Sequence, residues 1–339
     1  MKPRIESNFT VSQQVKFAFG KPYLPCKSEF LLNNSRSAML LALRALQLPA
    51  GTGVGMMVYN CHTVMNAIEQ AGYTPVFVDV DDNLKIDIYD LKRKADGMSA
   101  LIVTHLYGIV NDVRHIKELF PDLIILEDCA HAYGIENLFG DFATFSIGQG
   151  KLPSIGDGGL LVVRNDKYHG RVVSFYDNLP DYSLAQSTKL FVRLLLRSWM
   201  NSRIIYGWFT LPLKQKRPIT SGKETIVLKK MCRGISAIYA AEKSKIPAII
   251  EHRKQKAKEM RALLSTSDVL QVLVGINVFM LVVKSGHTKD IQKVLHKNGI
   301  DSATHFANAL LWAKEFGYQK GSCPNIEKMM NCLLMVPTY

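Results

Sequence analysis

The sequence predicts an α/β fold in which a large domain, built on a mostly parallel and doubly wound sheet, precedes a smaller C-terminal α/β domain. Three observations carry this prediction. Short apolar runs alternate with helical runs over the first half of the chain, one of the apolar runs ends in carboxylates, and the composition shifts from Ser221. Strands that alternate with helices are typical of right-handed βαβ units and therefore of parallel sheets.

The large domain is expected to span residues 1–215. Its first 27 residues predict an arm with a short strand, and residues 37–46 (SAMLLALRAL) are strong helix formers that Ser35 or Ser37 can cap. Further strands are expected at 54–58, 75–80, 100–105, 123–128, 142–147 and 160–164, and helices at 63–71, 88–95 and 113–120.

The smaller domain is expected to span residues 216–339. A long helical pattern covers 235–264, two strand-like runs follow at 269–274 and 278–283, and a helix is expected at 289–297. A chain of 339 residues that is 47% hydrophobic is long enough for one large core beside a smaller one.

The most informative stretch runs from Phe142 to Gly159 (FATFSIGQGKLPSIGDGG). Its β-rich start leads to Lys151, which lies among glycines that permit tight turns and a close backbone approach to a bound group. Upstream, the apolar run 123–126 leads directly into Glu127 and Asp128, as expected for a buried parallel strand with carboxylates at its carboxyl end. Binding crevices of open α/β sheets lie at such ends, so Asp128 and Lys151 are placed to touch one ligand.

A lysine and an aspartate in this arrangement suit pyridoxal 5'-phosphate (PLP). The lysine amine can bond to the aldehyde of PLP, and a carboxylate keeps its pyridine nitrogen protonated. His131 can donate to the phenolic oxygen or stack on the ring, and Ser146 can bind the phosphate. Taken singly, the same residues are also explained as a solvated lysine and an aspartate that caps a turn or a helix.

The order EDCAHA, FSIGQGK and GDGG resembles the DegT/DnrJ/EryC1/StrS family of PLP-dependent sugar aminotransferases, from about residue 31 to 164 and more faintly to the C-terminus. The resemblance implies the fold type I architecture of PLP-dependent transferases. It assigns the catalytic, cofactor-bearing lysine to Lys151, the pyridine-nitrogen aspartate to Asp128, the residue near the phenolic oxygen to His131 and a phosphate-binding serine to Ser146.

Two further cofactor contacts follow from the resemblance. The run NSRSAM resembles the helix start at which the family binds the cofactor phosphate, with Ser35 at the usual glycine position and Arg36 at the usual threonine position. Where the family places an aromatic residue over the pyridine ring, this chain has Cys61. We expect its neighbour His62 to contact the ring, and a polar loop residue would explain His62 equally well.

The resemblance implies an aminotransferase that moves an amino group from L-glutamate to a nucleotide-linked keto-sugar in surface polysaccharide or other glycan biosynthesis, working as a homodimer. Two alternatives stay open: a dehydratase-like relative, in which histidine replaces the lysine, and a diverged PLP-binding paralogue without turnover. The second rests on departures from the family pattern, which include the altered helix start at Ser35 and Arg36, the short C-terminus and a missing asparagine. The family's GxNxR motif, whose asparagine reaches the phosphate of the other subunit, corresponds here to ETIVLKKM, which has no asparagine.

The net charge and the cysteine spacing limit the kinds of binding partner and metal site that the sequence supports. A formal net charge of +13 suits anionic substrates such as nucleotide sugars, an acidic membrane surface or nucleic acid, and no nucleic-acid-binding signature supports the last. The six cysteines form no CxxC pair, which predicts reduced thiols in the cytoplasm and no metal site. No signal peptide is expected.

Residues 184–213 form an aromatic, arginine-bearing amphipathic segment. Arg193, Arg197 and Arg203 interrupt its apolar residues and exclude an uninterrupted membrane-spanning run. Such a segment can lie peripherally at the inner face of a membrane, and it can also pack on the partner subunit or on the smaller domain.

Overall fold

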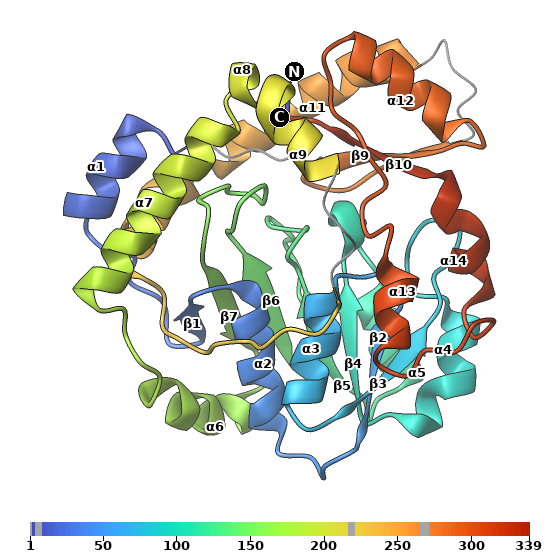
Figure 1. Ribbon diagram of the computed structural model, residues 1–339. Coiled ribbons are helices and arrows are strands. Elements are labelled where there is room, and N and C mark those ends of the chain that lie inside the picture. The colour runs from blue at the N-terminus through green and yellow to red at the C-terminus, as the bar shows by residue number, and fades with distance from the viewer. Residues whose placement is uncertain (1, 4–8, 216–220, 265–270) are drawn as a thin grey trace.

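A mixed sheet forms the centre of the protein. The computed structural model describes residues 2–3, 9–215, 221–264 and 271–339, and in these ranges seven strands pair in the order β1-β7-β6-β5-β4-β2-β3 (Figure 1). The strands are β1 (Glu29–Leu32), β2 (Gly53–Met57), β3 (Thr74–Val78), β4 (Ala100–Thr104), β5 (Ile124–Asp128), β6 (Phe142–Ser146) and β7 (Gly159–Val163). Neighbours from β3 to β6 are parallel, and β7 is antiparallel to β6 and β1.

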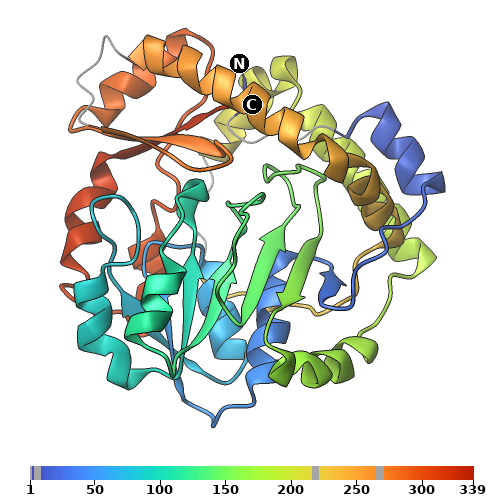
Figure 2. The same ribbon diagram turned by 180° about the vertical axis from the view of Figure 1, so that it is seen from behind.

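The predicted α/β architecture is confirmed. Each of the six expected strands is present with bounds that differ by at most two residues, and all five residues of β4 are buried, as the continuous apolar run predicts. Helices cover both faces of the sheet (Figures 1 and 2). They include α2 (Ser35–Leu46), α3 (His62–Gln70), α4 (Ile88–Lys94), α5 (Val113–Leu119) and α6 (Asp166–Asp177).

The cap of α2 differs from the expected one. The side chain of Asn34, and not that of Ser35 or Ser37, accepts a hydrogen bond from the Ser37 N–H at 2.9 Å. The same Asn34 oxygen accepts from the Ser37 hydroxyl at 2.9 Å. Asn34 is a strong N-cap residue, and its side chain satisfies the N–H of Ser37 in the first turn of the helix.

The N-terminal arm contains a helix where the sequence predicts an arm with a short strand. Helix α1 (Val11–Phe19) begins with a capping box in which Thr10 and Gln13 each bond the other's backbone N–H. This T-x-x-Q spacing is the sequence signal that the prediction missed. The helix packs on α10 (Arg233–Glu242), where a Cβ at Gly234 would lie 2.6 Å from the ring of Phe17.

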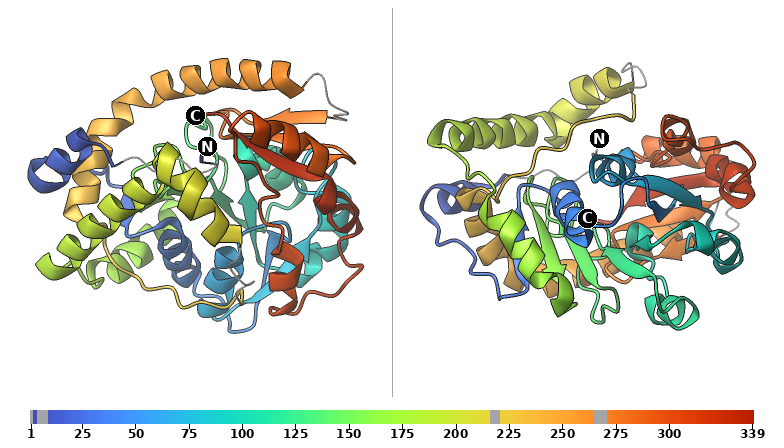
Figure 3. Two further views of the ribbon diagram at one scale, coloured as in Figure 1. Left: turned by 45° about the horizontal axis from the view of Figure 1, so that its top comes forward. Right: turned by 90° about the horizontal axis from the view of Figure 1, so that it is seen from below.

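The long helix expected over 235–264 is divided. Helix α10 ends in a 3-10 turn at Lys243–Lys245, and α11 (Ile246–Leu264) then continues to the small sheet, crossing one side of the molecule (Figure 3). Pro247 explains the break, because proline lacks an N–H and clashes with the preceding turn but fits the first turn of a new helix.

A smaller sheet lies in the C-terminal part. Among the described residues of that part, β8 (Gln271–Val274), β9 (Met280–Lys284) and β10 (Leu333–Pro337) form an antiparallel sheet in the order β10-β9-β8, beside α12 (Thr288–Lys297). The expected start of the first strand, 269–270, lies outside the described residues. Helices α13 (Ala309–Lys314) and α14 (Pro324–Met329) pack into the hydrophobic core of the seven-stranded sheet. The division at 215/216 adjoins residues 216–220, also outside the described ranges, and stays a prediction.

The amphipathic segment folds as α7 (Leu184–Met200), α8 (Arg203–Ile205), a π-helical turn (Tyr206–Thr210) and α9 (Leu211–Gln215). Helix α7 packs on its own chain: the rings of Phe191 and Phe9 lie 5.3 Å apart, and Leu190 and Leu194 are buried. Its outer side keeps apolar groups exposed, Trp199 at 63% among them. In the described part of the chain no helix is long and apolar enough to cross a membrane.

Helix α2 and strand β7 meet so closely that Gly159 admits no side chain. A Cβ there would lie 2.3 Å from the backbone of Asn34 and Ser35. Gly159→Ala should therefore lower the free energy of unfolding by about 1–3 kcal/mol, measured by urea denaturation. Gly170→Ala in α6 is the matched control, because nothing lies within 4 Å of its Cβ, and a gain of about 0.5–1 kcal/mol is expected from helix propensity. Equal effects of the two substitutions would contradict this account of the contact.

Candidate active site

A cavity of about 450 Å³ opens at the carboxyl ends of β4, β5 and β6. This is where the doubly wound topology predicts a binding crevice. The cavity brings together residues that lie far apart in the sequence. Of the seven residues expected from the sequence to act on or bind the cofactor, six line it: Ser35, Arg36, Asp128, His131, Ser146 and Lys151.

Asp128 ends β5 and is 4% exposed. One carboxylate oxygen accepts from the Ala130 N–H at 3.1 Å, and the other accepts from the hydroxyl of Thr104 at 3.2 Å. That hydroxyl in turn accepts from the Asn60 amide at 2.8 Å, so a buried chain of hydrogen bonds orients the carboxylate. Burial raises the pKa of Asp128 above its ordinary value, although the Ala130 N–H and the charge of Lys151 act in the opposite direction.

Lys151 lies in the loop between β6 and β7. Gly150, Gly156 and Gly158 adopt positive φ angles in this loop, and the Lys151 N–H donates to the Gly148 carbonyl at 3.1 Å. Burial lowers the pKa of the Lys151 amine, while the nearby charges of Cys61 and Asp128 raise it. A lowered pKa gives a larger share of neutral, nucleophilic amine at neutral pH.

His131 is held as a neutral imidazole with a defined tautomer. Its Nδ1 accepts from the backbone N–H of Tyr107 at 3.2 Å, which leaves the proton of the neutral ring on Nε2. Burial lowers its pKa well below the ordinary value, and the charges of Lys151 and His305 add to this. Its ring stacks on Phe279 at 4.5 Å between centroids. His131 is therefore built to donate a hydrogen bond from Nε2.

The N-terminus of α2 forms another wall of the cavity. Asn34 forms a β-bridge with Gly158, so the loop that carries Lys151 and the start of α2 are joined by backbone. Ser146 and Ser35 both line this cavity, and the Ser146 hydroxyl accepts from the Gly148 N–H at 3.4 Å. Free N–H groups at a helix start favour an anion.

His62 is the exception among the predicted residues, since it does not line the cavity. Its ring lies 4.7 Å from that of Trp312 and its Nε2 is 3.8 Å from a carboxylate oxygen of Glu224. The neighbouring Cys61 lines the cavity instead, with its sulfur 4.0 Å from His62 Nδ1. Burial favours the thiol form of Cys61, but the hydrogen bond and charge of His62 outweigh it and lower the pKa. The contacts with Cys61 and then Glu224 raise the pKa of His62 to about 9.

Several lining residues were not predicted from the sequence. They include Asn33, Asn60, Thr104, Asp157, Tyr182, Arg193, Arg197 and Phe306. Thr104 had a usable signal, because it ends the strand expected next to the one that bears Asp128. No sequence signal indicated Arg193 and Arg197, since their approach to the cavity depends on how α7 packs.

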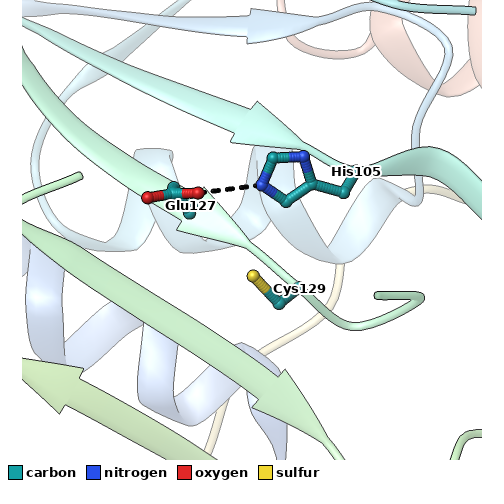
Figure 4. A group of neighbouring side chains, drawn as sticks. All are labelled: His105, Glu127 and Cys129. Atoms are coloured by element: carbon teal, nitrogen blue, oxygen red, sulfur yellow. Dashed lines mark hydrogen bonds and ion pairs between the residues drawn. The ribbon is translucent and has the colours of Figure 1, made fainter. Parts of the chain in front are cut away.

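A second polar cluster lies on the face of the sheet opposite the cavity. Ligand atoms of His105, Glu127 and Cys129 lie within 4.8 Å of one another and are buried (Figure 4). His105 Nε2 bonds Glu127 at 3.0 Å, and the other Glu127 oxygen accepts from the N–H groups of Phe139 and Gly140 at 2.6 and 2.5 Å. Burial and the charge of Glu127 raise the pKa of the Cys129 thiol well above its ordinary value. The ring of His105 and the carboxylate of Glu127 are therefore already hydrogen-bonded. These bonds hold the loop at Phe139 and Gly140 against the sheet.

Comparison with solved structures identifies the class of this fold. The chain superposes on a putative sugar aminotransferase, Spr1654 from Streptococcus pneumoniae in its PLP form, with a TM-score of 0.71 and 18% identity over 99% of this chain and 93% of that one. DesV from S. venezuelae gives a TM-score of 0.72 and 20% identity over 99% and 93%. The fold is that of PLP-dependent sugar aminotransferases, as expected.

The sequence comparisons point to the same kind of protein. Residues 22–179 match the model of the DegT/DnrJ/EryC1/StrS aminotransferase family. A GDP-perosamine synthase from Escherichia coli O157:H7 is 32% identical over 154 residues, which is 42% of each protein. A UDP-N-acetyl-3-dehydro-alpha-D-glucosamine 3-aminotransferase from Acidithiobacillus ferrooxidans is 32% identical over 166 residues, or 43% of this chain and 45% of that protein. The chain thus matches less than half the length of these relatives.

The ion pairs of Glu224 predict a pH-dependent contribution to stability. The hydrogen bond from His62, followed by Arg36, lowers the pKa of Glu224 from 4.5 to about 2. A depressed carboxyl pKa stabilises the fold above the unfolded value and loses this effect as the pH falls toward the folded value. Glu224→Gln should therefore be less stable than the wild type above pH 5, and the difference should shrink between about pH 4.5 and 2.

Urea denaturation at several pH values measures this difference. Glu118→Gln, which removes an exposed carboxylate paired with Arg114, is the control, and only a small difference from the wild type is expected for it. A Glu224→Gln deficit that stays constant down to pH 3 would show that the ion pairs are not its cause.

Proposed function

We propose that the protein is a PLP-dependent aminotransferase. The proposal rests on one observation. Lys151, Asp128 and His131 line the same cavity, which is also lined by the N-terminus of α2. Asp128 ends β5, His131 follows it by three residues, and Lys151 lies in the loop between β6 and β7. A surface lysine or a capping aspartate does not explain why these groups line the same cavity. The match of residues 22–179 to the model of the aminotransferase family supports the same reaction.

The chemistry of the lining residues fits PLP. Lys151 offers an amine of lowered pKa, Asp128 a buried carboxylate in a fixed orientation, and His131 an N–H donor. The hydroxyls of Ser35 and Ser146 and the free N–H groups of α2 suit a phosphate. When bound, PLP supplies an electron sink for the carbon that bears the transferred nitrogen.

Each residue then has a defined task. Lys151 would hold the cofactor through Nζ and would move a proton at the Cα of the amino donor. Asp128 would keep the pyridine nitrogen protonated, and His131 would offer its Nε2–H to the phenolic oxygen. Phe279, whose ring centroid lies 5.4 Å from Lys151 Nζ, keeps water from one side of the amine.

We assign L-glutamate as the donor and a nucleotide-linked keto-sugar in glycan biosynthesis as the acceptor. The names of the two relatives, which concern GDP- and UDP-linked sugars, support the acceptor class. A homodimer in the cytoplasm, with peripheral membrane contact through 184–213, completes the proposal. Lys151 favours transamination over a dehydratase-like reaction. A PLP-binding paralogue without turnover is the remaining alternative.

The first experiment tests the cofactor. With PLP, the purified wild type should show a new absorption band near the visible edge. Borohydride reduction should then leave one pyridoxyl group on Lys151, located by peptide mass spectrometry. Lys151→Ala should show neither, while Lys293→Ala, which removes an exposed lysine paired with Asp290, should behave as the wild type. Absence of modification in the wild type would refute the cofactor assignment.

The second experiment tests transamination. L-Glutamate should convert the wild-type spectrum to that of the aminated cofactor. In Asp128→Asn this half-reaction should be slower by about 10²–10³-fold, the usual effect of losing one preorganised electrostatic group, while borohydride still labels Lys151. If L-glutamate leaves the labelled wild type unchanged and L-glutamine also fails, the paralogue without turnover becomes the better interpretation.

A further inference from the structure

Helix α7 presents two arginines to the candidate active site. The buried side chains of Leu190 and Leu194 anchor the helix on its own chain, and Arg193 and Arg197 line the cavity that contains Lys151. The two arginines are four positions apart and therefore share one face of the helix. The amphipathic segment thus forms a wall of the site, a role that its sequence did not suggest.

The two guanidinium groups differ in their partners. Arg193 is paired with Asp157 at 2.5 Å, and Asp157 also accepts from the Gly158 N–H at 3.0 Å. For the guanidinium of Arg197, the described residues provide no hydrogen bond and no ion pair. Burial and the charge of Arg193 lower the pKa of Arg197, with Asp157 acting in the opposite direction. Arginine stays charged in proteins, so an anion at this point would relieve an unfavourable arrangement.

The arginines lie where two cavities join. Asn33, Tyr182, Arg193 and Arg197 also line a neighbouring cavity of about 580 Å³, whose wall includes Lys189 and Lys229. Asn33 is 9% exposed, and its side-chain amide oxygen has no hydrogen-bond partner among the described residues. A ligand that extends from the first cavity into the second would pass Arg197 and meet an acceptor for a hydroxyl group.

We infer that Arg197, with Arg193 beside it, binds a phosphate group of a ligand of this site. Guanidinium groups bind phosphate oxygens in a bidentate manner, and a phosphate between the two cations removes their repulsion. Helix α7 thereby supplies an anion contact within one chain. The identity of the ligand rests on the proposed function: the phosphate belongs either to PLP or to the diphosphate of a nucleotide sugar.

Ligand binding distinguishes the two sources without an activity assay. Dissociation constants are measured calorimetrically for PLP, for pyridoxal, which lacks the phosphate, and for GDP, UDP and inorganic pyrophosphate. Arg197→Gln should weaken binding of at least one phosphate-bearing probe by about 10- to 100-fold, the effect of one charge-assisted hydrogen-bonding group, and leave pyridoxal unaffected. Weaker PLP binding assigns the cofactor phosphate, and weaker binding of the diphosphates assigns the substrate.

Two variants serve as controls. Arg114→Gln on α5 removes the same charge from an exposed pair with Glu118 and should change no constant. Arg197→Lys keeps the positive charge and should recover part of the lost affinity, which a merely structural role would not predict. Circular dichroism verifies that each variant is folded, and if Arg197→Gln is not, Arg197→Lys carries the test through its intermediate affinity.

The inference is overturned if folded Arg197→Gln binds PLP, both nucleoside diphosphates and pyrophosphate as tightly as the wild type. It is also overturned if the wild type binds none of them. Failure of the proposed function has a different signature, in which the wild type binds no PLP while pyrophosphate or a nucleoside diphosphate still binds in a manner that depends on Arg197.

Discussion

The end of β5 imposes the main physical constraint on this structure. Glu127 and Asp128 are adjacent, and side chains alternate along a strand, so the two carboxylates point to opposite faces of the sheet. Glu127 is bonded behind the sheet by His105, and Asp128 turns to the cavity, where Thr104 donates to it. Buried carboxylates need such partners, and the register that places Thr104 opposite Asp128 provides one. A slip by one residue would exchange the roles of the two carboxylates.

The cavity is polarised from one side to the other. Asp128, Lys151 and the neutral His131 gather at the strand ends, where burial moves each pKa toward the uncharged form. The start of α2 and the arginines of α7 form other parts of the cavity wall. A ligand with an aromatic ring at one end and a phosphate at the other suits this division, and PLP is such a molecule.

Helix α7 lines the candidate active site, so the 184–213 segment has a role other than membrane contact. Its inner face carries buried leucines and the two arginines of the cavity wall, so a large part of its amphipathic pattern is used within the chain. Its outer face still exposes Trp199, and Trp208 follows at 80% exposure. Peripheral membrane contact and a subunit interface both remain proposals for that outer face.

By itself, the sequence determined the features that depend on local pattern. These are the alternation of strands and helices, the position of Asp128 at a strand end, and the glycine-rich loop around Lys151, which short-range sterics and burial dictate. The capping box of α1 was equally local and was overlooked. Only the tertiary structure decided which of Cys61 and His62 faces the cavity, because neighbouring positions at a helix start point about 100° apart. The tertiary structure alone also placed Arg197 in the cavity wall, since its position depends on how α7 packs against distant residues.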